Sequence, residues 1–414
     1  MRMNRSHRVL YVDTAPTVGG SVVSLHQLLR KLDRSRYEPV VLCYSPHEYV
    51  DSFRALGLDV VVWDAYAEAD YRPEWVKEAR GFAPIRWLRR TAGGARLYHT
   101  LGFIVMLARR VWPRARAVQS LIRQKGIDLV HTNIRVGHDR EAIVAARVEG
   151  VPCVSHIRDF EQLNWFDRRL AGMVSTFIYI SEAVQECHLL AGVPQSKGQV
   201  VYNAVDISAL GGALDVTATR KSLGLANGDP VVGIVGRLER WKGHDVFLRA
   251  MGRVKEAIPS ARGLIVGDPV PYDLDYRQWL LGLSDRLGLS ERVRFVPFRR
   301  DLPAVMAALD LLVLASTSPE PFGRVLIEAM AAGKPVVATG AGAVGEIVED
   351  GAEGILVPPG DAQALAEAVV DILTHPERAA KMGQTGLDTV RRRFDMWQHA
   401  NAVQSVYDDL LVRV

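Results

Sequence analysis

The chain has 414 residues, of which 48% are hydrophobic and 24% are charged, and its formal net charge is +4. This composition excludes a disordered chain and predicts a globular protein with two or more domains. The modest charge does not by itself indicate a nucleic-acid partner, and no apolar run is long enough to span a membrane. The three cysteines, Cys43, Cys153 and Cys187, lack metal-binding spacing, and their low, odd number is typical of a reducing compartment.

The chain opens with a pattern that is typical of nucleotide-binding folds. Residues 9–12 predict a strand, residues 13–21 a loop that contains Gly19 and Gly20, and residues 22–32 a helix. Paired glycines let the backbone approach a ligand closely, although a plain tight turn is an alternative. The apolar run at 9–12 is too short for the core of a signal peptide, so we expect none.

Residues 71–125 depart from the alternation of strands and helices. Between Glu78 and Asp128 the chain has no acidic residue, whereas basic and aromatic residues are interleaved there. The basic residues are Arg80, Arg86, Arg89, Arg90, Arg96, Arg109, Arg110, Arg114, Arg116, Arg123 and Lys125. This composition predicts that residues 80–125 form an interfacial segment on an anionic membrane surface. The alternatives are a helical pair with a solvated arginine face and, least favoured, a nucleic-acid site, which we do not expect.

The α/β pattern resumes at residues 128–133, where a strand ends in polar residues. Residues 151–155 predict a further strand, which ends at His156. A histidine at the carboxyl end of a strand is well placed for a ligand cleft, and a hydrogen-bonded structural histidine is the alternative. We predict that the first domain covers residues 1–206.

The second predicted domain covers residues 207–394, and a last helix follows at 395–414. Its buried strand at 231–235 leads into Arg237 and Lys242. Two fixed cations beside a strand end can neutralise the charge of a departing phosphate, whereas surface basic residues are the alternative.

The segment around residues 318–330 predicts a strand, a turn and a helix. An apolar run precedes it, serine, proline and glycine break the pattern, and a helix begins at Val325. Ligands in parallel α/β sheets bind beyond the carboxyl ends of the strands, and a helix N-terminus there favours anions. Glu320 and Glu328 flank that N-terminus and suit a ligand with both hydroxyl and phosphate groups. The alternative is that Glu320 caps the helix and Glu328 is solvated.

Glu320 and Glu328, with seven residues between them, resemble the E-x7-E signature of retaining GT-B glycosyltransferases. More narrowly, the match through residues 320–358 resembles glycosyltransferase family 4, the glycosyl transferases of group 1. Residues 236–243 resemble the family's G-R-L-x-x-x-K-G, and 200–206 its V-x-N-G-V-D, with Ala204 replacing the glycine. The resemblance implies an α/β fold of the GT-B type, in which two Rossmann-like domains face each other across a cleft.

The resemblance also implies roles for individual residues. Glu320 is expected to bind sugar hydroxyls and orient the anomeric carbon, with Arg237 and Lys242 stabilising the leaving diphosphate. His156 is expected to contact the donor sugar. No protein nucleophile is implied. The implied donor-binding residues are Glu328, Gly236, Phe322, Gly323, Arg324, Val325, Gly345 and Glu346, and those of the acceptor-side loop are Gly19, Gly20 and Ser21.

The implied reaction moves a sugar, with retention, from a UDP- or GDP-linked donor to a hydroxyl of a glycan or a lipid-linked acceptor. It would serve the synthesis of cell-surface polysaccharide or glycolipid, and it would require no metal or other cofactor. We expect a cytoplasmic protein, peripheral on the inner face of the cell membrane if residues 80–125 bind lipid. The sequence does not reveal the donor base, the sugar or the acceptor.

Three other functions are compatible with parts of the sequence. A nucleotide-sugar epimerase of GT-B fold would share the donor site, and a non-catalytic sugar-binding protein would share the fold. The third function, that of a dinucleotide-dependent oxidoreductase, is indicated only by the G-x-G-x-x-G pattern at 340–345. Asp273 and Asp275 have the spacing of a metal-binding D-x-D, but paired acids more often begin a surface helix.

Overall fold

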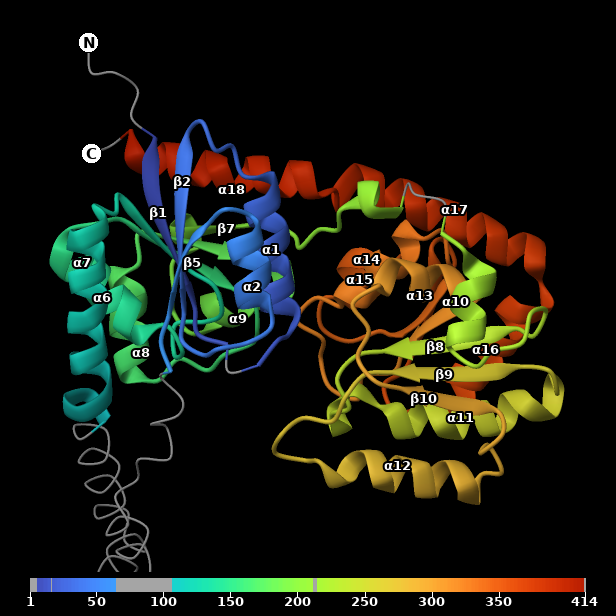
Figure 1. Cartoon of the computed structure of the whole chain (residues 1–414). Coiled ribbons are helices and arrows are strands. Elements are labelled where there is room, and N and C mark those ends of the chain that lie inside the picture. Colours follow the sequence, from blue (N-terminus) through green and yellow to red (C-terminus); the bar gives the residue numbers. More distant parts are fainter. Residues whose placement is uncertain (1–5, 16, 65–105, 211–213, 413–414) are drawn as a thin grey trace, which may run out of the picture. The chain divides into compact units, whose positions relative to one another are not determined.

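The computed structural model describes residues 6–15, 17–64, 106–210 and 214–412, so most of the predicted 71–125 segment lies outside the described residues. The chain divides into two compact units (Figure 1). The first unit comprises Met1–Tyr179, Val184–Val200 and Ala400–Val414, and the second comprises Ile180–Ala183 and Val201–His399.

The first unit contains a seven-stranded parallel sheet in the order β3-β2-β1-β4-β5-β6-β7. Its strands are β1 (His7–Asp13), β2 (Tyr37–Cys43), β3 (Asp59–Val62), β4 (Leu129–Thr132), β5 (Cys153–Ile157), β6 (Thr176–Tyr179) and β7 (Gly198–Val200). The helices are α1 (Gly20–Lys31), α2 (Tyr49–Ala55), a π-helix (Leu107–Val111), α6 (Trp112–Lys125), α7 (Arg140–Glu149), α8 (Trp165–Met173), α9 (Glu182–Leu190) and a short 3-10 turn (Gln195–Lys197).

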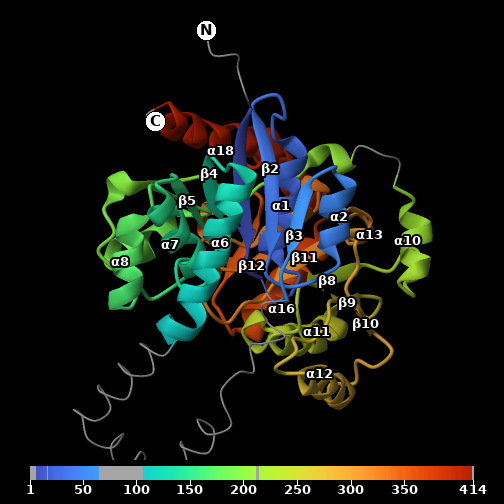
Figure 2. The same cartoon turned by 60° about the vertical axis from the view of Figure 1, so that its left-hand side comes forward.

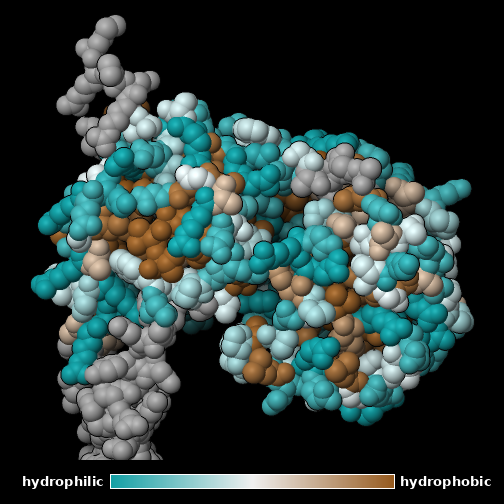
Figure 3. Space-filling model, in the orientation of Figure 1, coloured by the Kyte–Doolittle hydropathy of each residue, from teal (hydrophilic) through white to brown (hydrophobic). Residues whose placement is uncertain are grey.

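Burial explains why these segments form strands. Every residue of β4 and β5 is buried, as parallel strands are when helices cover both faces of a sheet. Helices α6 and α7 pack against each other beside this sheet (Figure 2). Figure 3 also shows hydrophobic residues gathered on the front surface of the first unit.

The second unit contains a six-stranded parallel sheet in the order β10-β9-β8-β11-β12-β13. Its strands are β8 (Val231–Val235), β9 (Arg262–Val266), β10 (Val293–Val296), β11 (Leu311–Leu314), β12 (Val336–Thr339) and β13 (Gly354–Val357). Its helices are two 3-10 turns (Ile207–Leu210, Arg240–Lys242), α10 (Val216–Ser222), α11 (His244–Ala257), α12 (Asp275–Arg286), α13 (Leu302–Ala308), α14 (Arg324–Ala331), α15 (Val344–Ile347), α16 (Ala362–Thr374), α17 (Pro376–Arg393) and α18 (Met396–Leu411), which ends in the first unit.

Three predicted boundaries were wrong by a few residues. Helix α1 begins at Gly20 rather than at residue 22, because the extended backbone of Gly19 already serves as its N-cap. Strand β5 runs to Ile157, so His156 lies within the strand rather than just after it. Helix α14 begins at Arg324, directly after the left-handed Gly323, and not at Val325. Such shifts are common because capping geometry, rather than apolar periodicity, sets where an element begins.

The last part of α18 belongs to the first unit. Tyr407 is fully buried there, and its hydroxyl lies 2.8 Å from His131 Nδ1 and 3.2 Å from the hydroxyl of Tyr11. These contacts join the end of the chain to β1 and β4. Among the described residues, no helix combines the length and the apolar character that crossing a membrane requires.

Candidate active site

The second unit brings Lys242 and Glu320 together at the carboxyl edge of its sheet. Lys242 Nζ lies 2.8 Å and 3.0 Å from the two carboxylate oxygens of Glu320, which also accepts a 2.7 Å hydrogen bond from Ser316 Oγ. The side chain of Glu320 is only 7% exposed, so water screens this ion pair weakly. Both residues were predicted from the sequence as catalytic, whereas Ser316 was not.

Gly243 lets the lysine-bearing turn approach the end of β11. Its φ of +69° is left-handed, and a Cβ there would lie 1.9 Å from the carbonyl oxygen of Ala315. Any other residue would push the turn away from the strand that leads to Glu320. The glycine of the K-G pair therefore sets the position of Lys242.

The backbone of Glu320 is held by the loop after β12. Its N–H donates to the carbonyl of Ala341 at 3.2 Å, and its carbonyl accepts from the N–H of Ala343 at 2.9 Å. Gly342 lies between them with a φ of +69°, and a Cβ there would lie 2.3 Å from the Glu320 carbonyl oxygen. Part of the G-x-G-x-x-G pattern at 340–345 thus serves the close packing of this loop on Glu320.

A buried carboxylate that sequence reasoning missed holds Arg237. Glu239 is buried, and its Oε2 lies 3.3 Å from Arg237 Nη2 and accepts a 2.9 Å hydrogen bond from Trp241 Nε1. The Tyr272 hydroxyl donates to the other carboxylate oxygen. The guanidinium of Arg237 remains half exposed and is thus oriented from one side while open to a ligand on the other. The position of Glu239, directly after the G-R-L residues, was the available signal.

Helix α14 begins directly after the left-handed Gly323, whose φ is +94°. In the first turn, the N–H of Leu326 donates to the carbonyl of Gly323 at 2.9 Å. The backbone N–H groups of Arg324 and Val325 come before Leu326 and lie at the N-terminus of the helix. Glu328 accepts a 2.7 Å hydrogen bond from Arg324. The two predicted donor-binding side chains thus form an i,i+4 ion pair.

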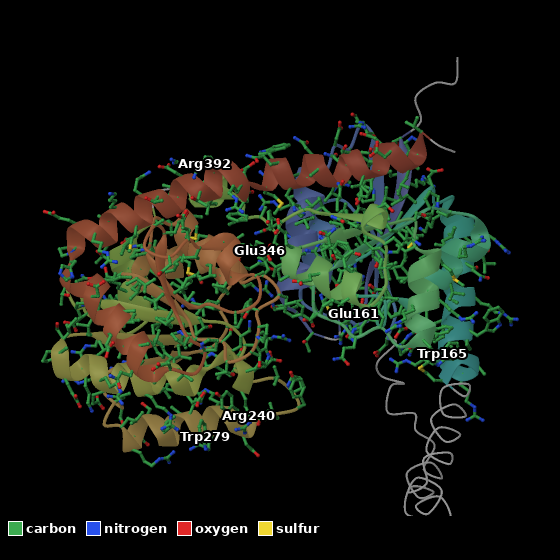
Figure 4. The ribbon with its side chains drawn as sticks, turned by 180° about the vertical axis from the view of Figure 1, so that it is seen from behind. Glu161, Trp165, Arg240, Trp279, Glu346 and Arg392 are labelled. Atoms are coloured by element: carbon green, nitrogen blue, oxygen red, sulfur yellow. The ribbon has the colours of Figure 1, made fainter. Side chains whose placement is uncertain are left out.

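Two other predicted donor-binding residues have structural contacts. Phe322 is buried against the rings of Tyr202 and Phe394, so only its backbone is available to a ligand. Glu346, on α15 next to Gly345, accepts from the backbone N–H groups of Glu182 and Ala183 at 2.7 and 2.9 Å (Figure 4). Gly236 directly follows β8 with a φ of +157°, and a Cβ on Gly267 would lie 2.0 Å from the Gly236 carbonyl oxygen.

In the first unit, a chain of polar contacts joins the first turn of α1 to β5. Asn133 donates to the carbonyl of Ser21 at 3.2 Å and accepts a 2.7 Å hydrogen bond from Arg158, whose guanidinium lies 3.3 Å from His156 Nδ1. His156 is fully buried. A Cβ on Gly19 would meet no atom within 4 Å among the described residues, so a close contact with them does not explain this glycine. The structure thus connects Ser21 with His156 through Asn133 and Arg158, neither of which was predicted as a site residue.

The D-x-D spacing at 273–275 belongs to a helix start. Asp273 pairs with Arg240 at 2.8 Å, and Asp275 lies in the first turn of α12. The prediction that these acids begin a surface helix is confirmed.

The groups gathered in the second unit are suited to stabilising negative charge on a phosphate. Arg237 and Lys242 are two cations held at fixed positions by carboxylates, and the N-terminus of α14 presents backbone N–H groups and the positive end of the helix dipole. Together these groups can stabilise a developing negative charge on a phosphate. Glu320, fixed by three hydrogen-bond donors, can accept hydrogen bonds from hydroxyl groups.

The comparisons with known proteins agree with this geometry. The profile of the family "Glycosyltransferase Family 4" matches residues 18–209, and that of "Glycosyl transferases group 1" matches residues 215–388. The chain belongs to this glycosyltransferase family. The two profiles match one after the other and leave only the segment between them and the two ends of the chain unmatched.

Curated relatives of this glycosyltransferase are similar over part of their length. A D-inositol 3-phosphate glycosyltransferase of Nocardia farcinica is 33% identical over 62% of this chain and 56% of its own. The lipopolysaccharide core biosynthesis mannosyltransferase LpsB of Rhizobium meliloti is 31% identical over 51% of this chain and 61% of its own. The chain thus spans little more than half the length of these curated relatives.

Solved structures confirm the GT-B fold of this glycosyltransferase. Alr3699/HepE of Anabaena, in complex with UDP and glucose, is 27% identical over 97% of this chain and 99% of its own, with a TM-score of 0.77. The same protein in complex with UDP-glucose gives a TM-score of 0.78. The sucrose-phosphate synthase of Thermosynechococcus elongatus, at 21% identity and a TM-score of 0.74, supports the fold alone.

Proposed function

We propose that this chain transfers a sugar from a nucleotide-sugar donor to a hydroxyl of its acceptor. The observation that carries the proposal is the Lys242–Glu320 ion pair at 2.8 Å, beside the Arg237–Glu239 contact at 3.3 Å. One pair places a cation and a sugar-binding carboxylate side by side, and the other fixes a second cation. A binding protein without catalysis would not need two cations held in this way.

In the proposed reaction, the donor diphosphate binds Arg237, Lys242 and the N-terminus of α14. Charge accumulates on the β-phosphate as its bond to the sugar breaks, and the two cations stabilise that charge. Glu320 holds the sugar hydroxyls and orients the anomeric carbon, and Glu328 binds the ribose. The leaving phosphate takes the proton of the acceptor hydroxyl on the same face of the sugar, which gives retention of the anomeric configuration. In this scheme the two cations do the work that a metal ion would otherwise do.

The relatives suggest which substrates to try first. The Anabaena protein binds UDP-glucose, so a UDP-linked hexose is our proposed donor, with a GDP-linked sugar as the second choice. The names of the curated relatives mention D-inositol 3-phosphate and the biosynthesis of a lipopolysaccharide core. We therefore propose a polar glycan or a lipid-linked glycan as acceptor, in the synthesis of cell-surface polysaccharide or glycolipid.

We also propose that the protein contacts a membrane surface, where a lipid-linked acceptor would lie. In the described part of the 80–125 segment, Arg109, Arg110 and Arg116 are exposed, and so is Trp112, with 48% of its surface accessible. Trp165 at the start of α8 is 60% exposed, with the guanidinium of Arg169 6.0 Å from its ring centre (Figure 4). Exposed tryptophan with arginine is typical of contact with anionic lipid headgroups. We propose that this surface holds the enzyme at the inner face of the cell membrane.

Flotation with anionic liposomes tests the membrane proposal. The charge reversals Arg109→Glu and Arg110→Glu together should abolish binding to the vesicles. The matched control reverses Arg249 and Arg253, two exposed arginines of α11 in the second unit, and should bind like the unchanged protein. No flotation of the unchanged protein would reject the proposal.

Turnover of the donor followed by proton NMR tests the proposed reaction. With UDP-glucose and a panel of hydroxyl acceptors, we expect UDP release and an anomeric signal of the same configuration in product and donor. Inverted configuration would reject retention. Interconversion of the free nucleotide sugar without acceptor would instead establish an epimerase.

A further inference from the structure

Three potential metal ligands meet at the carboxyl edge of the first sheet. Asp13 is the last residue of β1 and Cys43 the last residue of β2, and the two are direct partners in the parallel register. Partner residues in neighbouring strands direct their side chains to the same face of a sheet. His47, four residues beyond Cys43, returns to this face and lies 3.1 Å from Asp13 through its Nε2.

These side chains are closed off from solvent. The side chain of Asp13 is 0% exposed and that of His47 5%, and the thiol of Cys43 is free and fully buried. The other ring nitrogen of His47, Nδ1, is buried and has no hydrogen-bond partner among the described residues. One ligand atom from each residue lies within 4.8 Å of the other two.

The carboxylate of Asp13 is held with one oxygen towards His47. Asp13 Oδ1 accepts a 3.1 Å hydrogen bond from the N–H of Ala15, which leaves Oδ2 directed at His47. Hydrogen bonds of this kind fix the ligands of metal sites in proteins. The carbonyl of Asp13 accepts from the N–H of Tyr44 at 2.9 Å and thereby extends the pairing of the two strands past Cys43.

We propose that Asp13, Cys43 and His47 form a site for a single Zn²⁺ ion. A thiolate, an imidazole and a carboxylate are the three ligand types that zinc prefers, and a water would complete a tetrahedron. Zinc bonds of about 2.0–2.3 Å place the ligand atoms of a tetrahedron roughly 3.3–3.8 Å apart, so the three ligand atoms, which lie within 4.8 Å of one another, would have to approach by up to about 1 Å. The competing account is an ordinary Asp–His ion pair beside a buried thiol.

The proposed ion is structural and is separate from sugar transfer. It would join the ends of β1 and β2 to the loop that carries His47, and none of the three residues belongs to the site described above. Sequence reasoning missed the cluster because Asp13 lies thirty residues before Cys43, and only the strand register brings the two together. A bound metal that the unfolded chain binds poorly stabilises the folded state.

Titration of chelator-treated full-length protein with Co²⁺ tests the proposal. We expect one Co²⁺ per chain, with thiolate-to-cobalt charge-transfer absorption that Zn²⁺ abolishes as it replaces cobalt. Cys43→Ser should remove that absorption. Cys187→Ser, at a more accessible thiol outside the cluster, should retain it.

A second variant provides an independent test in case Cys43→Ser does not fold. His47→Gln, which leaves the buried thiol in place, should weaken Zn²⁺ binding by at least about 100-fold. It should also remove the rise in melting temperature that Zn²⁺ gives the unchanged protein. Absence of the charge-transfer absorption in the unchanged, folded protein would overturn the proposal. Absorption that Cys187→Ser loses and Cys43→Ser keeps would also overturn it.

Discussion

Glu320 is the residue on which the proposed chemistry depends most. It is buried, accepts from Lys242 and Ser316, and its backbone is fixed on both sides by the loop after β12. A side chain held so firmly can contribute to the transition state without reorganisation, which is the condition for strong electrostatic catalysis. The second carboxylate of the sequence motif, Glu328, pairs with the nearby Arg324 and suits a binding role.

We therefore predict different kinetic effects for the two carboxylates. Glu320→Gln should lower kcat by about 100-fold or more with little change in donor affinity, because the lost interaction acts on the reacting sugar. Glu328→Gln should mainly raise the KM for the donor, because the ribose is remote from the bond that breaks. Steady-state kinetics of the two variants measure this. Equal turnover in Glu320→Gln and the unchanged enzyme would contradict the assigned role.

Asp139 supplies a prediction about pH. Burial raises the pKa of this carboxyl to about 7 from 3.8, against the opposing hydrogen bond from Thr14 Oγ1 at 2.7 Å and two backbone donors. The folded state thus binds a proton that the unfolded chain has lost between those pH values. Its contribution to stability is complete below pH 3.8 and is lost as the pH rises to about 7.

Asp139→Asn removes this titration. Denaturant unfolding across that pH range should show the free energy of unfolding of the unchanged protein falling, relative to the variant, by roughly a few kcal/mol. The variant is expected to be less stable at low pH, since an amide replaces one acceptor oxygen. A constant difference across the range would mean that Asp139 titrates normally.

At the scale of elements, glycines with left-handed backbone set the position of the catalytic loops. Gly342→Ala would place a methyl group 2.3 Å from the Glu320 carbonyl at a φ of +69°. We expect it to lower the free energy of unfolding by about 2 kcal/mol and to lower kcat, because the Glu320 backbone must shift. Gly340→Ala is the matched control, since its nearest contact is 3.8 Å and its φ is not left-handed. Equal kcat and stability in the two variants would contradict the account.

Helix α18 stabilises the first unit through Tyr407. Tyr407→Phe keeps the ring but removes the hydroxyl that contacts His131 and Tyr11, which should lower the free energy of unfolding by about 1 kcal/mol. Trp397→Phe, on the same helix but 56% exposed, should change it little. Chemical denaturation of both variants provides the comparison.

Some of this element structure was predictable from the sequence. The strand at 311–314 and the helix after it follow from a local apolar run and its breakers, and the last helix, which was predicted at 395–414, runs over Met396–Leu411 as α18. The catalytic pair was accessible because Lys242 and Glu320 each lie in a recognisable motif. Asn133 and Arg158 were missed because their contact joins the ends of β4 and β5, which the strand order, not the sequence spacing, brings together. Glu239 was missed although its contacts with Arg237 and Trp241 are local in the sequence.

At the scale of the whole molecule, the two units contain different sets of proposed functional residues. The second unit holds the cations and carboxylates proposed for the donor. The first unit holds the loop of Gly19 to Ser21, the buried His156 and the proposed zinc ligands. The sequence predicted two α/β domains, because buried parallel strands read as continuous apolar runs. The boundaries at 206 and 394 stay predictions, and residues 71–105 lie outside the described part of the chain.

The most direct test of the central claim is a thermal-shift screen of the purified protein with UDP, GDP, ADP and NAD(P). We predict that one nucleoside diphosphate raises the melting temperature, because it binds only the folded second unit. Arg237→Ala should abolish that rise. Arg240→Ala, an exposed arginine of the same loop that pairs with Asp273, should preserve it. No shift with any nucleoside diphosphate, or a shift with NAD(P) alone, would contradict the account.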